Sequence, residues 1–274
     1  MDRVAAIRLG FFFGVLAIMA LWELLAPRRP LSTSKGARWF ANLGLVLIDT
    51  LALRLLFPIT LAAFAHLLKL RGWGLLNQLS LPSYMLVALG VIGLDLLIYL
   101  QHAMFHAIPA FWRLHLVHHT DLDFDVTTGV RFHPVEILLS MLIKMAGVAA
   151  LGISALAVVL FEILLNGTSM FNHGNVKLPP GIDRILRLLV VTPEMHRVHH
   201  SVIIREHNSN FGFNLPWWDR LLGTYRAQPA AGHQGMVIGL GPFRDPQKLS
   251  LPRLLALPFH YKPAHSPLGQ PGSE

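Results

Sequence analysis

Long apolar runs set the first limit on what this chain can fold into. Residues 4–25, 39–68 and 83–106 carry few charges, and each is long enough to cross a bilayer, which takes about 20 apolar residues in an α-helix. A fourth run, residues 135–165, is too short for two full crossings at about 1.5 Å of rise per residue, so it predicts a partly embedded helical hairpin. The sequence therefore predicts an all-α integral membrane protein with about three spanning helices and this hairpin, capped by a cytosolic helical domain.

Loop charges and composition divide the chain further. The loop after the first run carries Arg28, Arg29, Lys35 and Arg38 and no acid, and basic loops favour the cytoplasmic side. We expect residues 1–82 to form membrane anchor helices and residues 83–226 to form the metal-binding domain with its hairpin. Residues 227–274 are expected to be a partly disordered extension, because the tail PFHYKPAHSPLGQPGSE is rich in proline and glycine.

Composition excludes several classes of protein. The chain is 53% hydrophobic, 14% charged and has a net charge of +8. In so apolar a chain the basic excess favours anionic lipid head groups as partners, and no nucleic-acid-binding motif is present. The absence of cysteine excludes disulfides, thiolate haem and iron–sulfur ligation by this chain.

Histidine is concentrated in one part of the chain. Ten of the 15 histidines lie between positions 102 and 200, and the pattern H-x2-H-H occurs twice. Residues three and four apart share a face of a helix, so each pattern gathers imidazoles, which are common metal ligands. Because a first-row metal ion takes no more than about six ligands, this number of histidines predicts two ions. The candidate ligands are His102, His106, His115, His118, His119, His196, His199 and His200.

Six ordered blocks between about residues 94 and 226 resemble the fatty acid hydroxylase/sterol desaturase superfamily of integral membrane di-iron oxidases. The blocks are HAMFH, HLVHH, RFHPVE, FNHGNV, TPEMHRVHHS and NSNFGFNLPWWDRLLGTY. The resemblance implies a non-haem di-iron oxidoreductase that uses O2 to hydroxylate or desaturate a lipid C–H bond, with His173 as a further ligand. It also implies a separate electron donor, a ferredoxin or cytochrome-type carrier with its reductase. A bacterial-type member would lie in the inner membrane with its site on the cytoplasmic face.

Some other polar residues are expected to hold the ligand histidines in place. Asp95 and Tyr99 share one helical face with His102 and His106, and polar groups inside a membrane helix usually face the protein interior. We therefore expect Asp95 to orient a ligand histidine by hydrogen bonding.

Two further residues are assigned supporting roles. Asn166 lies on the face that leads to His173 and is expected to assist it. His133 is either a tenth ligand or a residue that supports a ligand. Its position is usual but not universal in the superfamily that the chain resembles, which favours the supporting role.

The acidic run and the isolated histidines are not expected to bind the metal ions. The D-x-D-x-D run at Asp121 lacks the EF-hand glycine and distal glutamate, which favours a solvated loop. His207 lies where the superfamily usually lacks histidine, so it is expected at the surface. The histidines expected to be dispensable are His66, His207, His233, His260 and His265.

Three alternative functions remain open at this point. A zinc membrane hydrolase typically uses three protein ligands and a glutamate base, but HExxH is absent and histidine is too abundant. A bis-histidine haem carrier needs single histidines on facing helices rather than adjacent pairs. A non-catalytic metal-binding or transport protein would bind metal without consuming O2.

Overall fold

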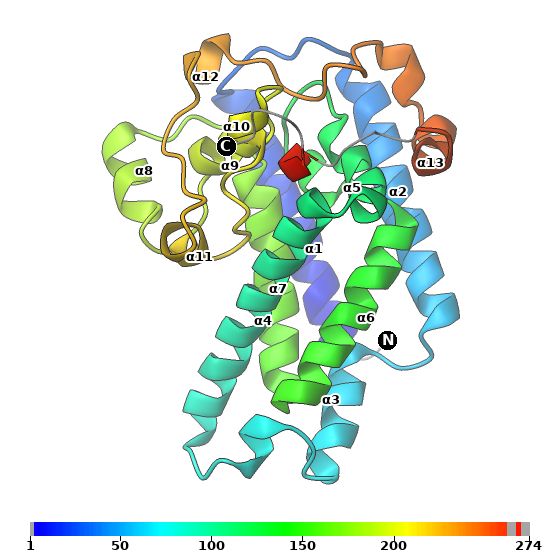
Figure 1. Ribbon diagram of the computed structural model, residues 1–274, viewed down its shortest axis with the longest axis vertical. Coiled ribbons are helices and arrows are strands. Elements are labelled where there is room, and N and C mark those ends of the chain that lie inside the picture. The colour runs from blue at the N-terminus through cyan, green and yellow to red at the C-terminus, as the bar shows by residue number, and fades with distance from the viewer. Residues whose placement is uncertain (1–2, 262–266, 270–274) are drawn as a thin grey trace.

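The computed structural model describes residues 3–261 and 267–269, and over these residues the chain is helical and has no strand. Five segments are long and apolar enough to cross a membrane by length and composition. They are α1 (Arg3–Leu25), α2 continued by α3 (Lys35–Leu56, Leu61–Leu70), α4 (Ser83–Ala107), α6 (Pro134–Leu151) and α7 (Ala155–Asn172). Figure 1 shows them as an elongated bundle with short helices gathered at one end. The predicted all-α membrane architecture is confirmed, and α6 with α7 forms the hairpin. Each of these two helices has 18 residues and is long and apolar enough to cross a membrane, because the hairpin continues to Asn172, beyond the apolar run that the sequence analysis counted.

Breaks in the spanning segments follow local chemistry. The second segment is interrupted at Pro58, which has no backbone N–H to continue α2, and the Thr60 hydroxyl then caps α3. The hairpin turns at Gly152, whose φ of +68° is the left-handed conformation that favours glycine. A Cβ at Gly74 would lie 2.3 Å from the Gly152 Cα, so the loop after α3 approaches this turn closely only because both residues are glycine.

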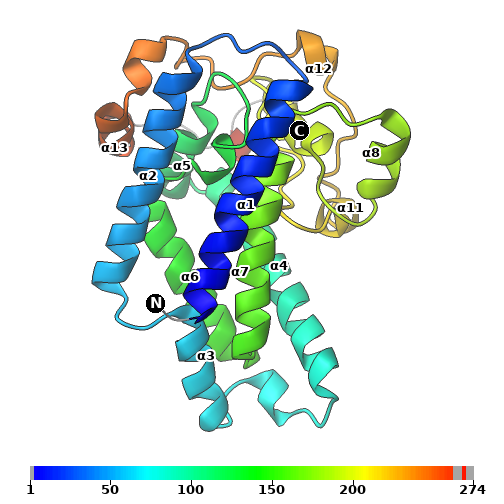
Figure 2. The same cartoon turned by 180° about the vertical axis from the view of Figure 1, so that it is seen from behind.

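The bundle packs around α7. This helix contacts α1, α3 and α4, and Figure 2 shows α1 running beside it on the rear face. Buried side chains such as Leu94, Ile98, Val158 and Phe161 form the main apolar cluster between these helices. The cluster supports the ends of α4 and α7 from which histidines emerge.

The cap is built from short helices at one end of the bundle (Figure 1). Its α-helices are α5 (Pro109–His119), α8 (Pro180–Leu186), α9 (Pro193–His199), α10 (Ile204–His207), α11 (Trp217–Leu221), α12 (Gly232–Gly235) and α13 (Leu251–His260). The chain also has four short 3-10 turns. One of them, η1 (Leu75–Gln78), lies between α3 and α4 and is not part of the cap. The others are η2 (Thr128–Val130), η3 (Pro246–Leu249) and η4 (Pro267–Gly269).

The C-terminal extension is more ordered than the sequence suggested. Helix α13 packs against α2 and α5, and its Leu254 is fully buried beside Leu45 and Val117. The expectation of disorder is therefore wrong as far as His260, because these apolar side chains cover the outer face of the α2–α5 contact. The rest of that tail, including His265, falls largely outside the described residues.

Candidate metal centre

Four helical segments supply nine buried histidines. α4 contributes two and α5 three, the residue after α7 contributes one, and the end of α9 contributes three. Each is at most 2% exposed, and the set is His102, His106, His115, His118, His119, His173, His196, His199 and His200. A single residue, Ile108, separates α4 from Pro109 at the start of α5, so the chain turns back and His106 meets His119.

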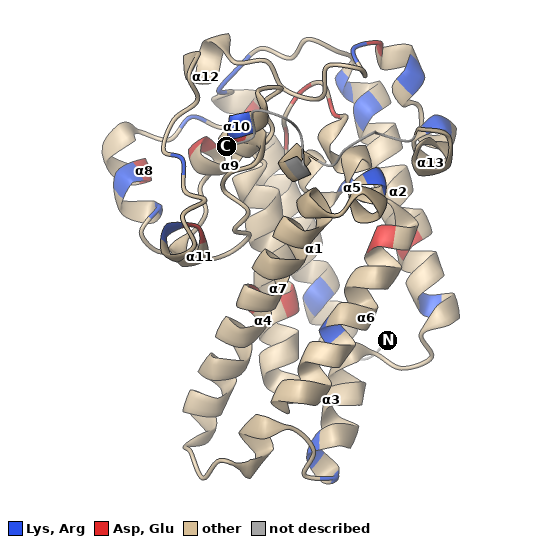
Figure 3. Cartoon of the chain, viewed as in Figure 1, with Lys and Arg blue, Asp and Glu red and all other residues tan. Residues whose placement is uncertain are grey.

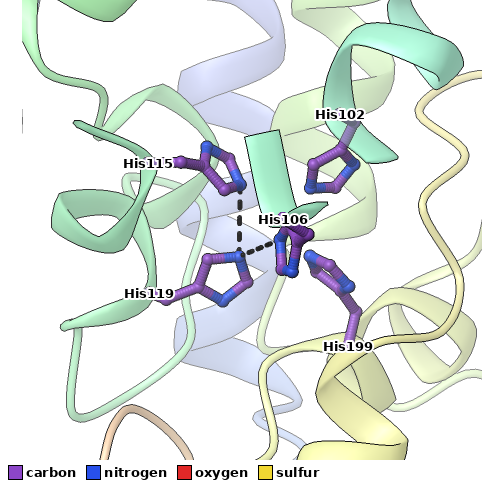
Figure 4. Close-up of side chains that lie close together, drawn as sticks. All are labelled: His102, His106, His115, His119 and His199. Carbon is purple, nitrogen blue, oxygen red and sulfur yellow. Dashed lines mark hydrogen bonds between the residues drawn. The ribbon is translucent and has the colours of Figure 1, made fainter. Parts of the chain in front are cut away.

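The nine side chains form two groups, each with its ligand-capable atoms within 4.8 Å of one another. The first group is His102, His106, His115, His119 and His199, and Figure 4 shows these rings pointing toward one another. The second group is His118, His173, His196 and His200. The structure thus brings together every histidine that the sequence nominated as a ligand.

Within the second group, His173 lies at the centre. Its Nε2 is 3.2 Å from the Nε2 of His118 and 3.1 Å from the Nε2 of His196. In the first group the His119 Nε2 is 3.1 Å from the Nε2 of His106 and 3.2 Å from the Nε2 of His115. Each group therefore focuses nitrogen atoms on a small volume.

The outer ring nitrogens settle the proton positions of several rings. The Nδ1 atoms of His118 and His173 lie 3.2 Å and 2.7 Å from the backbone oxygens of Arg131 and Ser169. A carbonyl oxygen only accepts, so each Nδ1 carries the proton and each Nε2 of a neutral ring presents a lone pair. Two lone pairs 3.2 Å apart cannot hydrogen-bond to each other, so this pair needs a cation between its members.

A protonated imidazole does not supply this positive charge. Burial lowers the pKa of His173 to about 3 and holds the pKa of His118 well below its ordinary value. The rings are thus neutral at physiological pH, and neutral imidazole is the form that binds metal.

In the first group the Nε2 atoms of His102 and His199 have no hydrogen-bond partner among the described residues, while their Nδ1 atoms donate to the carbonyls of Phe211 and Ser209. The donor set fits metal ions in both groups.

A carboxylate that sequence analysis did not single out supports the first group. Glu136, in the first turn of α6, accepts a 2.6 Å hydrogen bond from the Nδ1 of His115. Such a contact fixes the tautomer of a metal-binding histidine and raises its basicity. Glu136 lies in the RFHPVE block, but its 21-residue separation from His115 follows no helical spacing, so only the packing of α6 on α5 reveals the pair.

Asp95 is placed differently from the expectation. Its carboxylate accepts from Asn214 Nδ2 and Trp218 Nε1, both at 2.8 Å, and from the backbone of Leu215 rather than from a histidine. The prediction that Asp95 orients a ligand directly is wrong, because the segment after α10 folds over this face of α4. Asp95 instead secures the segment whose Phe211 carbonyl accepts from His102.

Tyr99 reaches the same segment through a chain of hydrogen bonds. Its hydroxyl lies 2.8 Å from the Thr224 hydroxyl, which donates to Asp219. Asp219 in turn accepts from the backbone N–H of Phe211 at 2.7 Å. By hydrogen bonds Tyr99 thus reaches His102 through three intervening residues, and its ring also meets that of Phe211 edge-on, with the ring centroids 6.3 Å apart.

Two other supporting assignments also differ. The His133 Nδ1 accepts from the N–H of Val135 as the cap of α6, and its Nε2 bonds to the Leu255 carbonyl on α13, so His133 contacts no ligand histidine. Asn166 is exposed and donates to the Glu162 carbonyl one turn back in α7. Asn166 points away from the site because α7 carries it to the outer face of the bundle.

His207 is not at the surface. It is 1% exposed, and its ring centroid lies 4.3 Å from that of His119 and 4.9 Å from that of His106. Burial lowers the pKa of His207 to about 3. No periodic pattern in the sequence predicts this contact, because His207 ends α10, a helix of only four residues.

The acidic run is also buried rather than solvated. Arg38 binds Asp121 and Asp125, each at 2.6 Å, and Asp123 accepts from the backbone N–H groups of Ser32 and Thr33. Burial favours the neutral acid, but Arg38 outweighs it and holds the pKa of Asp121 well below its ordinary value. These contacts attach the loop that follows His119 to the start of α2.

Three other histidines of the described residues lie apart from both groups. His66 and His260 are exposed. His233 is buried, with its Nε2 2.8 Å from a carboxylate oxygen of Glu194.

The chain is similar to known proteins over the region that carries the histidines. The fatty acid hydroxylase family model matches residues 87–224, half of the chain, and this range contains all nine histidines. No solved structure matches the chain.

Three curated relatives show how the likeness extends beyond that range. Ornithine lipid hydroxylase OlsE of Rhizobium tropici is 27% identical over 80% of this chain and 66% of its own length. Cholesterol 25-hydroxylase of Rattus norvegicus is 27% identical over 81% of this chain and 74% of its own length. Human alkylglycerol monooxygenase is 27% identical over 61% of this chain, but the match spans only 36% of that protein.

Proposed function

The chain belongs to the fatty acid hydroxylase family, and from that premise we propose that it hydroxylates a lipid C–H bond with O2 at a centre of two iron ions. The observation that carries the proposal is the convergence of histidine ring nitrogens in two buried groups, each within 4.8 Å. Five histidines would hold one ion and four the other, which leaves both ions coordination positions within the limit of about six.

The reaction consumes one O2, two electrons and two protons, inserts one oxygen atom into the C–H bond and releases the other as water. When bound, iron supplies the O2 reduction and the removal of hydrogen that no amino-acid side chain can perform. The electrons would come from a separate ferredoxin or cytochrome-type carrier with its reductase.

This chain's own residues hold and isolate the centre. In five of the nine rings, hydrogen bonds from Nδ1 to Glu136 or to a backbone carbonyl keep Nε2 directed inward. Phe124 and Phe132 stack on His173 and His118, which excludes water from the second group. A dry site limits loss of the oxidising species to solvent.

The zinc-hydrolase alternative is not favoured by the site. Neither group contains a carboxylate among its ligand-capable atoms, whereas zinc hydrolases place a glutamate beside the metal-bound water.

The relatives direct the choice of product. The three relatives are named as hydroxylases or monooxygenases, and their names refer to an ornithine lipid, cholesterol and alkylglycerol. We therefore propose hydroxylation of a membrane lipid rather than desaturation.

Lipid profiling tests the proposal. Membranes from cells that express the chain should contain a lipid one oxygen atom heavier than its precursor, and the mass increase should follow 18O2 rather than H218O. Expression of His118→Ala at matched abundance is the control and should leave the precursor unchanged. A lipid that loses two hydrogens, or a product labelled from water, would contradict hydroxylation by O2.

A further inference from the structure

An apolar surface projects from the cap beside the bundle. Helix α8, the turn after it and the end of α11 expose large side chains, which are between 51% and 74% exposed. We call these residues the α8–α11 surface: Ile182, Ile185, Leu188, Leu189, Leu221 and Leu222. In Figures 1 and 2 both helices lie on the same outer side of the molecule, away from α2 and α13.

The two parts of this surface are held together as a unit. Trp217 donates through Nε1 to the Leu188 carbonyl at 2.7 Å, and Arg220 donates to the Arg187 carbonyl at 3.1 Å. The apolar side chains of α8 and α11 therefore form one continuous surface rather than isolated exposed residues.

The depth of the surface follows from its attachment to α4. The 2.8 Å bond between Trp218 Nε1 and Asp95 places α11 within one side chain's length of Asp95. Asp95 lies 12 residues before Ala107, or about 18 Å along a helix that is long enough to span a membrane. The α11 end of the α8–α11 surface thus lies beside α4, near the middle of a helix long enough to span a membrane, at a depth that lipid would occupy around such a helix.

The charges around the surface have one sign. The four acidic residues between positions 177 and 226 are buried, whereas three basic side chains beside α8 and α11 are exposed. Figure 3 marks both kinds of residue along the ribbon. The buried acids are Asp183, Glu194, Glu206 and Asp219, and the exposed basic residues beside α8 and α11 are Lys177, Arg184 and Arg220. An apolar face with a basic rim is the pattern of a segment that lies in an anionic membrane interface.

We propose that the α8–α11 surface is embedded in the leaflet on the histidine side of the membrane, with anionic lipid head groups at its basic rim. An acidic protein partner would also suit the basic rim, but the attachment to Asp95 sets the apolar residues at the depth of lipid. The cap is then held to the bilayer by this surface as well as by the spanning helices.

The chain has no cysteine, so single labelled positions can be compared directly. Nitroxide labels on Leu189→Cys and Leu222→Cys would be measured in nanodiscs of phosphatidylcholine with phosphatidylglycerol. Leu89→Cys, exposed on α4, is the control for lipid, and Gln247→Cys, exposed on η3, is the control for water. Accessibility to O2 and to a water-soluble nickel chelate reports the depth of each label without requiring catalysis.

Labels at Leu189 and Leu222 should resemble the Leu89 label, with high O2 and low nickel accessibility. Behaviour like the Gln247 label would overturn the membrane assignment and leave a protein partner as the better explanation of the surface.

The basic rim is tested with spin-labelled lipids. Wild-type protein should retain phosphatidylglycerol in preference to phosphatidylcholine, and Lys177→Gln with Arg184→Gln should reduce that preference. An unchanged preference would refute the role of the rim.

Discussion

At the scale of single residues, the site depends on which nitrogen of each imidazole carries the proton. Backbone carbonyls accept from the Nδ1 atoms of His102, His118, His173 and His199, while Glu136 performs this role for His115. A carbonyl cannot donate, so the tautomer is fixed by the fold and each Nε2 remains free to bind metal.

The contact between Glu136 and His115 should influence metal binding without supplying a ligand. Glu136→Gln keeps the shape of the side chain but removes its charge, so we expect a loss of about 10–100-fold in metal affinity or activity. The measurement is iron content and product formation at matched abundance. Glu162→Gln is the matched control, because Glu162 is also buried but pairs with Arg8. Equal losses in both variants would show that Glu136 has only a general structural role.

His118 and His207 should behave differently although both are buried beside the centre. His118→Ala removes a member of the second group and should abolish turnover and lower the bound metal toward one ion per chain. His207→Ala leaves a cavity beside His119 and should reduce turnover while both ions remain bound. Metal analysis and product assays separate the two effects. Loss of metal in His207→Ala would make His207 a ligand.

At the scale of elements, α2 and the loop after α5 are fastened by a buried ionic network. Arg38 on α2 binds Asp121 and Asp125, and Asn42 on the same helix accepts from Arg131 at 2.7 Å. The Arg131 guanidinium also donates to the Val117 carbonyl, within α5, at 2.8 Å. The network therefore holds the HLVHH motif of α5 in place against the bundle.

Arg38→Met should destabilise the folded protein strongly, because it leaves buried carboxylates without their counterion. Breaking a buried pair in this way typically costs about 3–5 kcal/mol. The pKa of Asp121 is depressed in the folded state, so its contribution to stability is present above its unfolded pKa of about 4 and is lost as pH falls through the folded pKa. Thermal unfolding in detergent across acid pH should show this loss in the wild type. A similar acid dependence in Arg38→Met would contradict the assignment to this pair.

At the scale of the whole molecule, the basic loop between α1 and α2 lies on the histidine side of the bundle. Arg28 binds Glu194 at 2.7 Å and Arg29 donates to the Met236 carbonyl at 2.7 Å. The loop charges used to infer orientation are thus partly paired within the protein, and the loop and the histidines lie at the same end of the bundle.

Metal content provides a test at this scale. Two groups of histidines predict two ions per chain in protein purified from iron-replete cells. A reproducible content near one ion would contradict a two-ion centre, whichever element is present. Extraction with a chelator should abolish product formation, and iron should restore it.

Orientation can be tested with single cysteines in intact cells. Gly36→Cys, at the histidine end, should be shielded from an impermeant thiol reagent, whereas Ser80→Cys, before α4 at the opposite end, should react. Both residues are exposed, so burial does not bias the comparison. The reverse pattern would place the histidines outside the cytoplasm.

The sequence by itself determined the helical membrane class and eight of the nine histidines that gather in the site, because apolar length and helical spacing are local properties of the chain. The ninth, His173, was predicted from the family resemblance. It could not place Glu136, His207 or the buried acidic loop, whose partners come from distant elements. It also misassigned Asp95, since a helical face states which side chains point together but not which segment will cover them. Only tertiary packing decided those contacts, because burial and hydrogen bonding arise when the cap folds over the ends of α4 and α7.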